Sequence, residues 1–220
     1  MTTNFTAKVL FSGPAPAALP PLEGVQVTAV SSPLASDALA PALAGAWYWP
    51  EAAAAVASHG SHLDVSLPAG EGPATARALV LTRALAVLAA QPGAAAVLWE
   101  ATSLLHAPDA WSAQAEDAGE QDLPILLWIA FDGTEDDAGA RTLSTRGLSG
   151  FGVLEVEVPS SRRDGEEVLE IVCDVALVAL ASAGPLEDGE PVEVTRGEVR
   201  VRVAPSLRGD GSKAYRLRLP

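Results

Sequence analysis

The segment 123–131 constrains the fold of this chain more than any other part of the sequence. It reads LPILLWIAF and carries no charged side chain. A short apolar run of this kind, followed here by an acidic loop at 132–139, is typical of a strand that is buried on both faces. We therefore expect the segment to form the central strand of a sheet, with helices or a second layer covering it.

Apolar patterns on both sides of this segment predict the remaining elements. Alternating or compact apolar runs predict strands at 7–11, 25–30, 62–67, 95–100, 142–146, 153–158, 192–203 and 214–219. Amphipathic or capped runs predict helices at 38–43, 51–58, 74–90, 108–119 and 166–182, the last of them capped by Asp164. The helix at 108–119 would act as a crossover and let strand 95–100 run parallel to the central strand.

These elements predict an α+β fold with a mixed, largely antiparallel sheet and helices packed on it. A chain of 220 residues can bury roughly 70% of the surface that it exposes when unfolded, so a self-sufficient core is expected. We expect a single α+β domain over residues 1–220. Two fused βα halves, 1–120 and 121–220, stay open as the alternative.

The charge balance restricts the class of partner. Acidic residues outnumber basic residues by 28 to 14, which gives a net charge of −14. Nucleic acid and anionic membranes require clustered Lys and Arg, so we exclude both and expect a protein partner with a basic surface. The alternative, that the charge only keeps the chain in solution, stays open. Half of the basic residues follow Val194, where they would also protect the edges of the terminal strands against aggregation.

Cysteine usage and hydropathy indicate the compartment. Cys173 is the one cysteine of the sequence, which excludes an intramolecular disulfide and favours a reducing cytoplasm. The first residues lack the basic and apolar regions of an export signal, and no uncharged stretch reaches the length of a membrane span. We therefore expect a cytoplasmic protein, and the sequence leaves its oligomeric state open.

Two groups of residues are candidates for a binding surface. Trp47, Tyr48 and Trp49 are consecutive, so they cannot all face the core, and at least one is expected at a surface where a partner docks. Glu166, Glu170 and Asp174 lie four residues apart on one face of the predicted helix 166–182 and repel one another by roughly 0.2–0.5 kcal/mol per pair. Either solvent screens this repulsion, or the stripe meets a basic partner.

Catalytic and metal-binding patterns are weak. His59 and His62, with Asp64 nearby, have the side-chain types of a metal site, but His59 ends a predicted helix while His62 begins a strand, so we expect no metal there. GLSGF at 147–151 differs from the nucleophile elbow, because a strand and not a helix follows Ser149, so a tight glycine turn is expected. Cys173 lies among apolar helix residues and is expected to be an inert, buried thiol. No cofactor is expected.

Four sequence motifs are spread over most of the chain. They are WYWP at 47–50, HxxHLxVS at 59–66, LTR at 81–83 and, as the most specific, TRGLxxFGxxExE at 145–157. Together they resemble an uncharacterised bacterial family, domain of unknown function 4261, from about residue 47 to the end of the chain. The resemblance implies a bacterial α+β domain and supplies no catalytic residues. The association of related domains with toxin and secretion systems favours a role in partner binding.

We therefore predict a non-enzymatic, acidic protein-binding module, whose narrower form is an immunity protein or adaptor acting on a toxin, an effector or a secretion-system partner. Its candidate binding residues are Trp47, Tyr48, Trp49, Glu166, Glu170 and Asp174. Two alternatives stay open. One is a hydrolase or metal-dependent enzyme that uses His59, His62 and Asp64, and the other is a structural component of a bacterial assembly.

Overall fold

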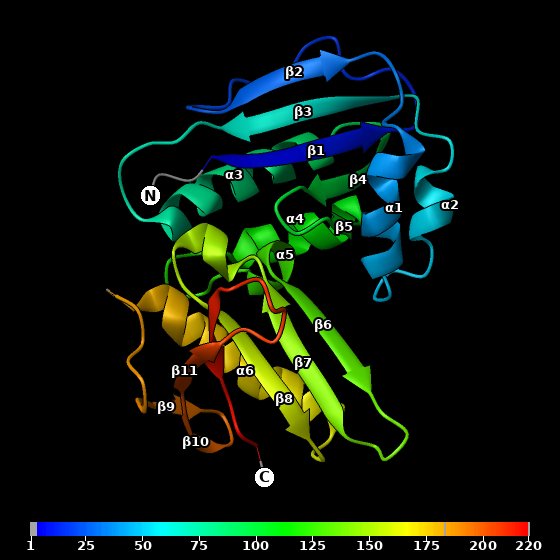
Figure 1. Cartoon of the computed structure of the whole chain (residues 1–220). Coiled ribbons are helices and arrows are strands. Elements are labelled where there is room, and N and C mark those ends of the chain that lie inside the picture. Colours follow the sequence, from blue (N-terminus) through cyan, green and yellow to red (C-terminus); the bar gives the residue numbers. More distant parts are fainter. Residues whose placement is uncertain (1–3, 183, 220) are drawn as a thin grey trace. The chain divides into compact units, whose positions relative to one another are not determined.

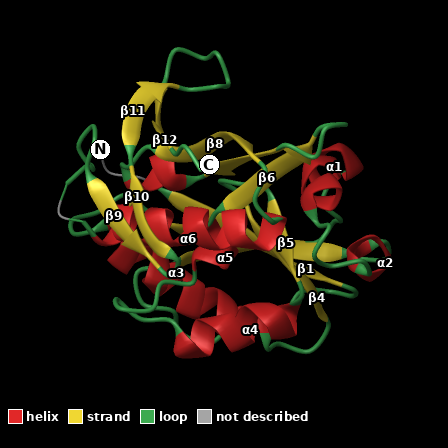
Figure 2. Cartoon of the chain, turned by 90° about the horizontal axis from the view of Figure 1, so that it is seen from below, coloured by secondary structure: helices red, strands yellow, loops and turns green. Residues whose placement is uncertain are grey.

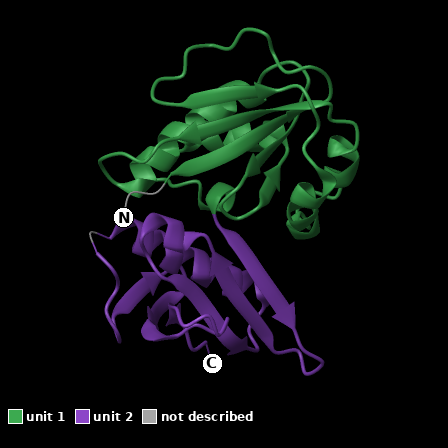
Figure 3. Cartoon of the chain, turned by 45° about the horizontal axis from the view of Figure 1, so that its top comes forward, with its two compact units in different colours: residues 1–128 green, residues 129–220 purple. Residues whose placement is uncertain are grey.

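A computed structural model describes residues 4–182 and 184–219 (Figure 1). The chain divides into two compact units, unit 1 with residues 1–128 and unit 2 with residues 129–220 (Figure 3). Helices pack on antiparallel and mixed sheets, which confirms the predicted α+β class (Figure 2). The boundary between the units follows Trp128, whereas the sequence suggested halves that meet at 120/121. The single domain stays a prediction.

Unit 1 is built on a five-stranded antiparallel sheet with the strand order β2-β3-β1-β4-β5. The central strand β1 pairs with β3 and β4, and its residues from Val9 to Phe11 are fully buried. The sequence predicted four of these strands and missed the short β5. The strands are β1 (Phe5–Phe11), β2 (Gln26–Val30), β3 (Ser61–Leu67), β4 (Ala94–Trp99) and β5 (Leu104–His106).

Helices cover both faces of this sheet. Leu98 packs in a cluster with residues of α1 and α2, while its neighbour Trp99 lies 6.1 Å from Trp111 of α4, measured between ring centroids. Successive side chains of a strand point to opposite faces, so α1 and α2 cover one face, and α4 covers the other together with α3, on which it packs. The helices are α1 (Ser36–Gly45), α2 (Ala52–Val56), α3 (Ala74–Ala89) and α4 (Pro108–Asp117).

A buried threonine of α3 satisfies the polar atoms of two tryptophans in this core. The hydroxyl of Thr82 accepts a hydrogen bond from Trp128 Nε1 at 2.8 Å, and its backbone oxygen accepts one from Trp111 Nε1 at 3.1 Å. The backbone oxygen of Trp128 accepts in turn from the hydroxyl of Thr102 at 3.1 Å. Thr82, Trp111 and Trp128 are all fully buried, so these bonds replace water that cannot reach them.

Unit 2 is built on a mixed five-stranded sheet with the strand order β11-β12-β8-β7-β6, in which β12 and β8 are parallel. The long helix α6 (Gly165–Ala181) packs on β8, and the separate hairpin of β9 and β10 packs on α6. As predicted, Asp164 caps α6, because its carboxylate accepts a hydrogen bond from Glu166 N at 2.9 Å. The strands are β6 (Ala130–Glu135), β7 (Arg141–Arg146), β8 (Glu155–Ser161), β9 (Pro191–Val194), β10 (Gly197–Arg200), β11 (Arg202–Pro205) and β12 (Lys213–Arg216).

The predicted central strand is wrong. Ile125–Trp128 forms one turn of helix, α5, and the strand that follows, β6, lies at the edge of its sheet with exposed side chains from Asp132 on. Leu126 is 51% exposed while Leu127 is fully buried. An apolar run of this length fits a buried helical turn as well as a buried strand, and Pro124 is compatible with a first helical turn.

Two further predictions that depended on this strand are also wrong. The stretch after β4 continues into the antiparallel strand β5 and then α4, so no crossover leads to a parallel neighbour of β4. The loop predicted at 132–139 is in part β6, which pairs with β7 as a hairpin. Across residues 4–182 and 184–219, no helix combines the length and the apolar character that a membrane crossing requires.

Replacing Thr82 by Val tests the polar centre of unit 1. Val has nearly the shape of Thr but offers no acceptor to Trp128 Nε1, so we expect the free energy of unfolding to fall by about 1–3 kcal/mol. Urea denaturation followed by tryptophan fluorescence measures the change. Thr82→Ser keeps the hydroxyl and is the control. Equal stability of wild type and Thr82→Val would show that the hydroxyl contributes nothing.

Candidate functional site

The three consecutive aromatic residues lie between α1 and α2 and have different environments. Trp47 is 73% exposed, Tyr48 is 39% exposed, and Trp49 packs against the buried cluster beneath α1 and α2. The expectation that at least one of the three faces solvent is therefore met by Trp47. Its ring meets that of Tyr48 edge to face, with centroids 5.7 Å apart. Trp47 and Tyr48 are called the aromatic pair below.

Tyr48 is fixed from beneath by strand β5. Its hydroxyl donates a hydrogen bond to the backbone oxygen of Leu105 at 3.0 Å, and its ring stacks on His106 with centroids 5.6 Å apart. Burial raises the pKa of Tyr48 to about 12, so the hydroxyl stays protonated and remains a donor at any physiological pH. The aromatic pair therefore rests on a rigid support.

His106 links the aromatic pair to the tryptophan core. It is 5% exposed and meets Trp111 edge to face, with centroids 5.4 Å apart. Its Nε2 is buried and has no hydrogen-bond partner in the part of the chain that the structure describes. Burial lowers the pKa of His106 to about 4, an effect that a hydrogen bond to the Leu127 backbone partly opposes. The imidazole is therefore neutral at pH 7.

His59, the first histidine of the metal pattern, uses both ring nitrogens for hydrogen bonds to the backbone. His59 Nε2 accepts a hydrogen bond from Leu34 N at 2.8 Å, and Nδ1 lies 2.6 Å from Val56 O. A backbone N–H only donates and a carbonyl only accepts, so Nδ1 carries the proton and the lone pair of Nε2 is occupied. His59 therefore connects α2 to the loop before α1, and it has no lone pair left for a metal.

His62 and Asp64 share one face of β3, but the ammonium group of Lys8 pairs with Asp64 and with Glu100, the acids that could otherwise bind a metal. Asp64 Oδ1 lies 3.5 Å from His62 Nε2 and only 2.5 Å from Lys8 Nζ. Glu100 pairs with the same ammonium at 3.3 Å. Within residues 4–182 and 184–219, no three His, Cys, Asp or Glu side chains are placed to hold a metal ion. The geometry gives no support to an enzyme built on His59, His62 and Asp64.

The acidic stripe of α6 is mostly engaged within unit 2. Glu170 Oε2 pairs with Arg196 Nε at 2.6 Å, and Asp174 Oδ2 accepts a hydrogen bond from Thr195 N at 2.7 Å. Thr195 and Arg196 form the turn between β9 and β10, so these two acids position the hairpin on the helix. Glu166 is exposed, and in the described residues its carboxylate has no partner. The three residues are thus not one open surface.

The glycine-rich motif at 145–157 proves to be an anchored turn. The carboxylate of Glu155 accepts hydrogen bonds from the backbone N–H groups of Gly147, Leu148 and Ser149 at 2.9, 3.2 and 3.0 Å, and from the hydroxyl of Thr145 at 2.8 Å. Gly147 has a φ of 123°, which favours glycine. Ser149 lies in a short 3₁₀ turn, η1 (Leu148–Phe151), and not in a nucleophile elbow. This agrees with the tight glycine turn that the sequence predicts. Leu148 is fully buried.

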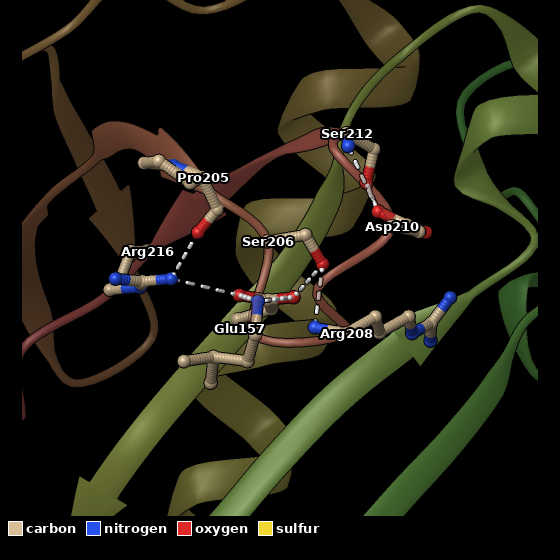
Figure 4. A network of polar contacts seen from close by, with 8 residues as sticks. Glu157, Pro205, Ser206, Arg208, Asp210, Ser212 and Arg216 are labelled. Atoms are coloured by element: carbon tan, nitrogen blue, oxygen red, sulfur yellow. Dashed lines mark hydrogen bonds and ion pairs between the residues drawn. The ribbon is translucent and has the colours of Figure 1, made fainter.

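Glu157, two residues further along the same face of β8, holds a second loop (Figure 4). It is 1% exposed and accepts hydrogen bonds from Ser206 Oγ at 2.7 Å and from Leu207 N at 3.0 Å. Arg216 Nη2 lies 3.4 Å from it and also donates to the Pro205 backbone oxygen. The sequence showed Glu157 only as part of a motif, since its partners lie some fifty residues away.

Cys173 is half-buried on α6, so it is more exposed than the buried thiol that the sequence predicts. Burial and the neighbouring Asp174 raise the pKa of its thiol to about 11. The thiolate form is therefore scarce at pH 7, and this form is the one that reacts. Cys173 packs in α6 as a small apolar residue.

No protein-family model, no curated protein and no solved structure matches the chain. The likeness to domain of unknown function 4261 therefore stays a prediction.

Acid should weaken unit 1 through His106. Unfolded His106 binds a proton near its ordinary pKa of 6.5 and folded His106 only near 4, so the unfolded state binds more protons between these values. Stability should therefore fall as the pH drops from about 6.5 to 4, by about 3 kcal/mol in total. Urea denaturation at several pH values measures the slope. His106→Phe keeps the ring stack and should flatten the slope, and an unchanged slope would contradict this role.

Removing the Glu157 carboxylate should destabilise unit 2. Glu157→Ala leaves the guanidinium of Arg216 without its partner and Leu207 N without an acceptor, so we expect a loss of roughly 3 kcal/mol or more. Glu157→Gln keeps one acceptor oxygen and should lose less. Denaturation midpoints measure the loss of stability, and protease cleavage at 206–212 measures the release of the loop. If both variants unfolded like wild type, the network in Figure 4 would not hold the loop.

Proposed function

We propose that this chain is a protein-binding module whose contact centre is the aromatic pair, and that its partner presents a basic surface. The observation that carries the proposal is Trp47, which is 73% exposed yet rests edge to face on an anchored Tyr48. Trp and Tyr are the side chains most enriched among the residues that dominate binding energy.

The support beneath the aromatic pair favours binding over chance exposure. A flexible side chain loses about 0.5–1.5 kcal/mol of conformational free energy when a partner immobilises it. Tyr48 is already held by Leu105 and His106, so a partner that contacts it meets a nearly fixed ring. Preorganised aromatic residues of this kind are also characteristic of antibody binding sites.

The charge of the chain supports the class of partner. The net charge of −14 repels acidic proteins and accelerates encounter with basic ones. Asp37 of α1 and Glu51 at the start of α2 are exposed acids in the two helices that flank the aromatic pair. Glu170 and Asp174 are engaged inside unit 2, so the proposal no longer includes them as an open docking stripe.

An immunity protein or adaptor that acts on a toxin, an effector or a secretion-system partner is the narrower form of this proposal. It draws on the resemblance described above and on the acidic surface. A structural component of a larger assembly is the alternative. It would be favoured if the partner proved to be a second copy of this chain or a repeating array.

Substituting Trp47 tests the proposal. A photo-crosslinking amino acid at the exposed position 51, which leaves Trp47 in place, captures the native partner, and calorimetry with the purified partner then gives the Kd. Trp47→Ala should raise the Kd by about 30-fold, which corresponds to roughly 2 kcal/mol. Its melting temperature should not change, since an exposed side chain contributes little to stability.

The matched control is Val87→Ala, which removes another exposed apolar side chain of unit 1, 42% exposed on α3. It should leave the Kd unchanged. Rising salt should slow association with the wild type, because screening weakens attraction between opposite charges. A partner that binds Trp47→Ala as tightly as wild type, or that is itself acidic, would overturn the proposal.

A further inference from the structure

Three arginines from separate segments of unit 2 line one hollow. They are Arg200 at the end of β10, Arg202 at the start of β11 and Arg218 just after β12. The hollow measures about 380 Å³. Sites for small ligands occupy ~300–1,000 Å³, so the space suits a small molecule or one charged group of a larger one.

Two of these guanidinium groups are oriented without being neutralised. Arg202 Nε lies 3.4 Å from Asp188, and Arg200 Nη2 lies 3.5 Å from Glu198. Both arginine side chains are more than half exposed, and exposed pairs at such distances contribute roughly 0–1 kcal/mol. Arg200 Nη1 also donates to the Gly189 backbone oxygen at 3.2 Å, which orients the guanidinium group.

The third arginine is the freest. Arg218 is exposed, and it has no hydrogen-bond or ion-pair partner in residues 4–182 and 184–219. Its five N–H donors, and the terminal N–H groups of Arg202, are therefore available to a ligand. The three guanidinium groups repel one another, and the exposed Asp188 and Glu198 offset this repulsion only in part, so an anion in the hollow would stabilise the arrangement.

Protection of strand edges explains only part of this cluster. β10 is an edge of the two-stranded sheet and β11 is an edge of the five-stranded sheet, so Arg200 and Arg202 could keep these edges from pairing with other chains. β12 lies between β11 and β8, and Arg218 follows it. An arginine beside an inner strand has no edge to protect.

We infer that the hollow binds a small molecule through a di- or triphosphate group. Guanidinium groups hold phosphate oxygens in paired, fork-like hydrogen bonds. Asp188 and Glu198 pair only weakly with two of the arginines, so all three guanidinium groups can still donate to phosphate oxygens. A di- or triphosphate has enough oxygens for all three, whereas a single carboxylate has only two. A long nucleic acid is disfavoured, because its backbone would meet the repulsion of a chain with a net charge of −14. The inference does not depend on the proposed function.

Calorimetric titration with inorganic pyrophosphate tests the inference. The full chain should bind it with a Kd below about 1 mM, more tightly than orthophosphate, and added salt should weaken binding. Arg202→Gln and Arg218→Gln should each raise the Kd about tenfold or more, since each removes a charged hydrogen-bond pair. Both positions are exposed, so unchanged melting temperatures would show that the variants are folded.

Arg162→Gln is the matched control, because Arg162 is an exposed arginine of unit 2 outside the hollow. It should bind pyrophosphate like wild type. Equal weakening in this control would mean that only net charge matters and would overturn the site. A wild type that does not bind pyrophosphate would also overturn the site. If Arg200→Gln and Arg202→Gln then aggregated, protection of the strand edges would be the role of these two residues. A phosphoserine peptide that binds more tightly than pyrophosphate would overturn the choice of a small molecule.

Discussion

The carboxylate of Glu157 is withdrawn from water, and the folded chain has to surround it with donors. Ser206 and Leu207 of the loop after β11 supply them together with Arg216 of β12, and the loop is fixed as a result. Glu155 does the same for the turn at 147–149. In unit 1 the hydroxyl of Thr82 performs the corresponding task for a tryptophan of the core. The pairing of these buried polar groups thus decides the local structure around them in both units.

The same requirement removes most of the residues that suggested chemistry. His59 bridges two backbone segments, Asp64 pairs with Lys8, and Glu170 pairs with Arg196. Each has the side-chain type of a catalytic or binding group, and each is engaged in holding its own fold. The features that stay unexplained by folding are on the surface. They are the exposed ring of Trp47 and the arginines around the hollow of unit 2, and both proposals rest on them.

Local patterns in the sequence predicted local structure well. The alternation at 62–67 and the spacing of leucines at 74–90 gave β3 and α3 with nearly their observed bounds, and Asp164 was recognised as the cap of α6. The prediction for segment 123–131 was wrong because an apolar run indicates burial but does not indicate which element the buried segment packs against. The acceptor of the Trp128 indole N–H lies 46 residues away and the partners of Glu157 lie 49 or more residues away, and no local pattern marks them. The same holds for Arg218, whose neighbours in the hollow were visible only as an excess of basic residues after Val194.

The two proposed sites respond to salt in different ways, because one depends on contact and the other on charge. Burial of an aromatic ring at an interface is insensitive to ionic strength, whereas attraction between exposed charges decays over a Debye length of about 8 Å at physiological salt. A dianion in the arginine hollow would change the net charge from −14 to about −16 and so strengthen the field that attracts a basic partner. This electrostatic attraction raises the association rate constant, and high salt removes it. The contribution of Trp47 belongs to the lifetime of the complex and persists there, so the salt dependence of association and dissociation separates the two.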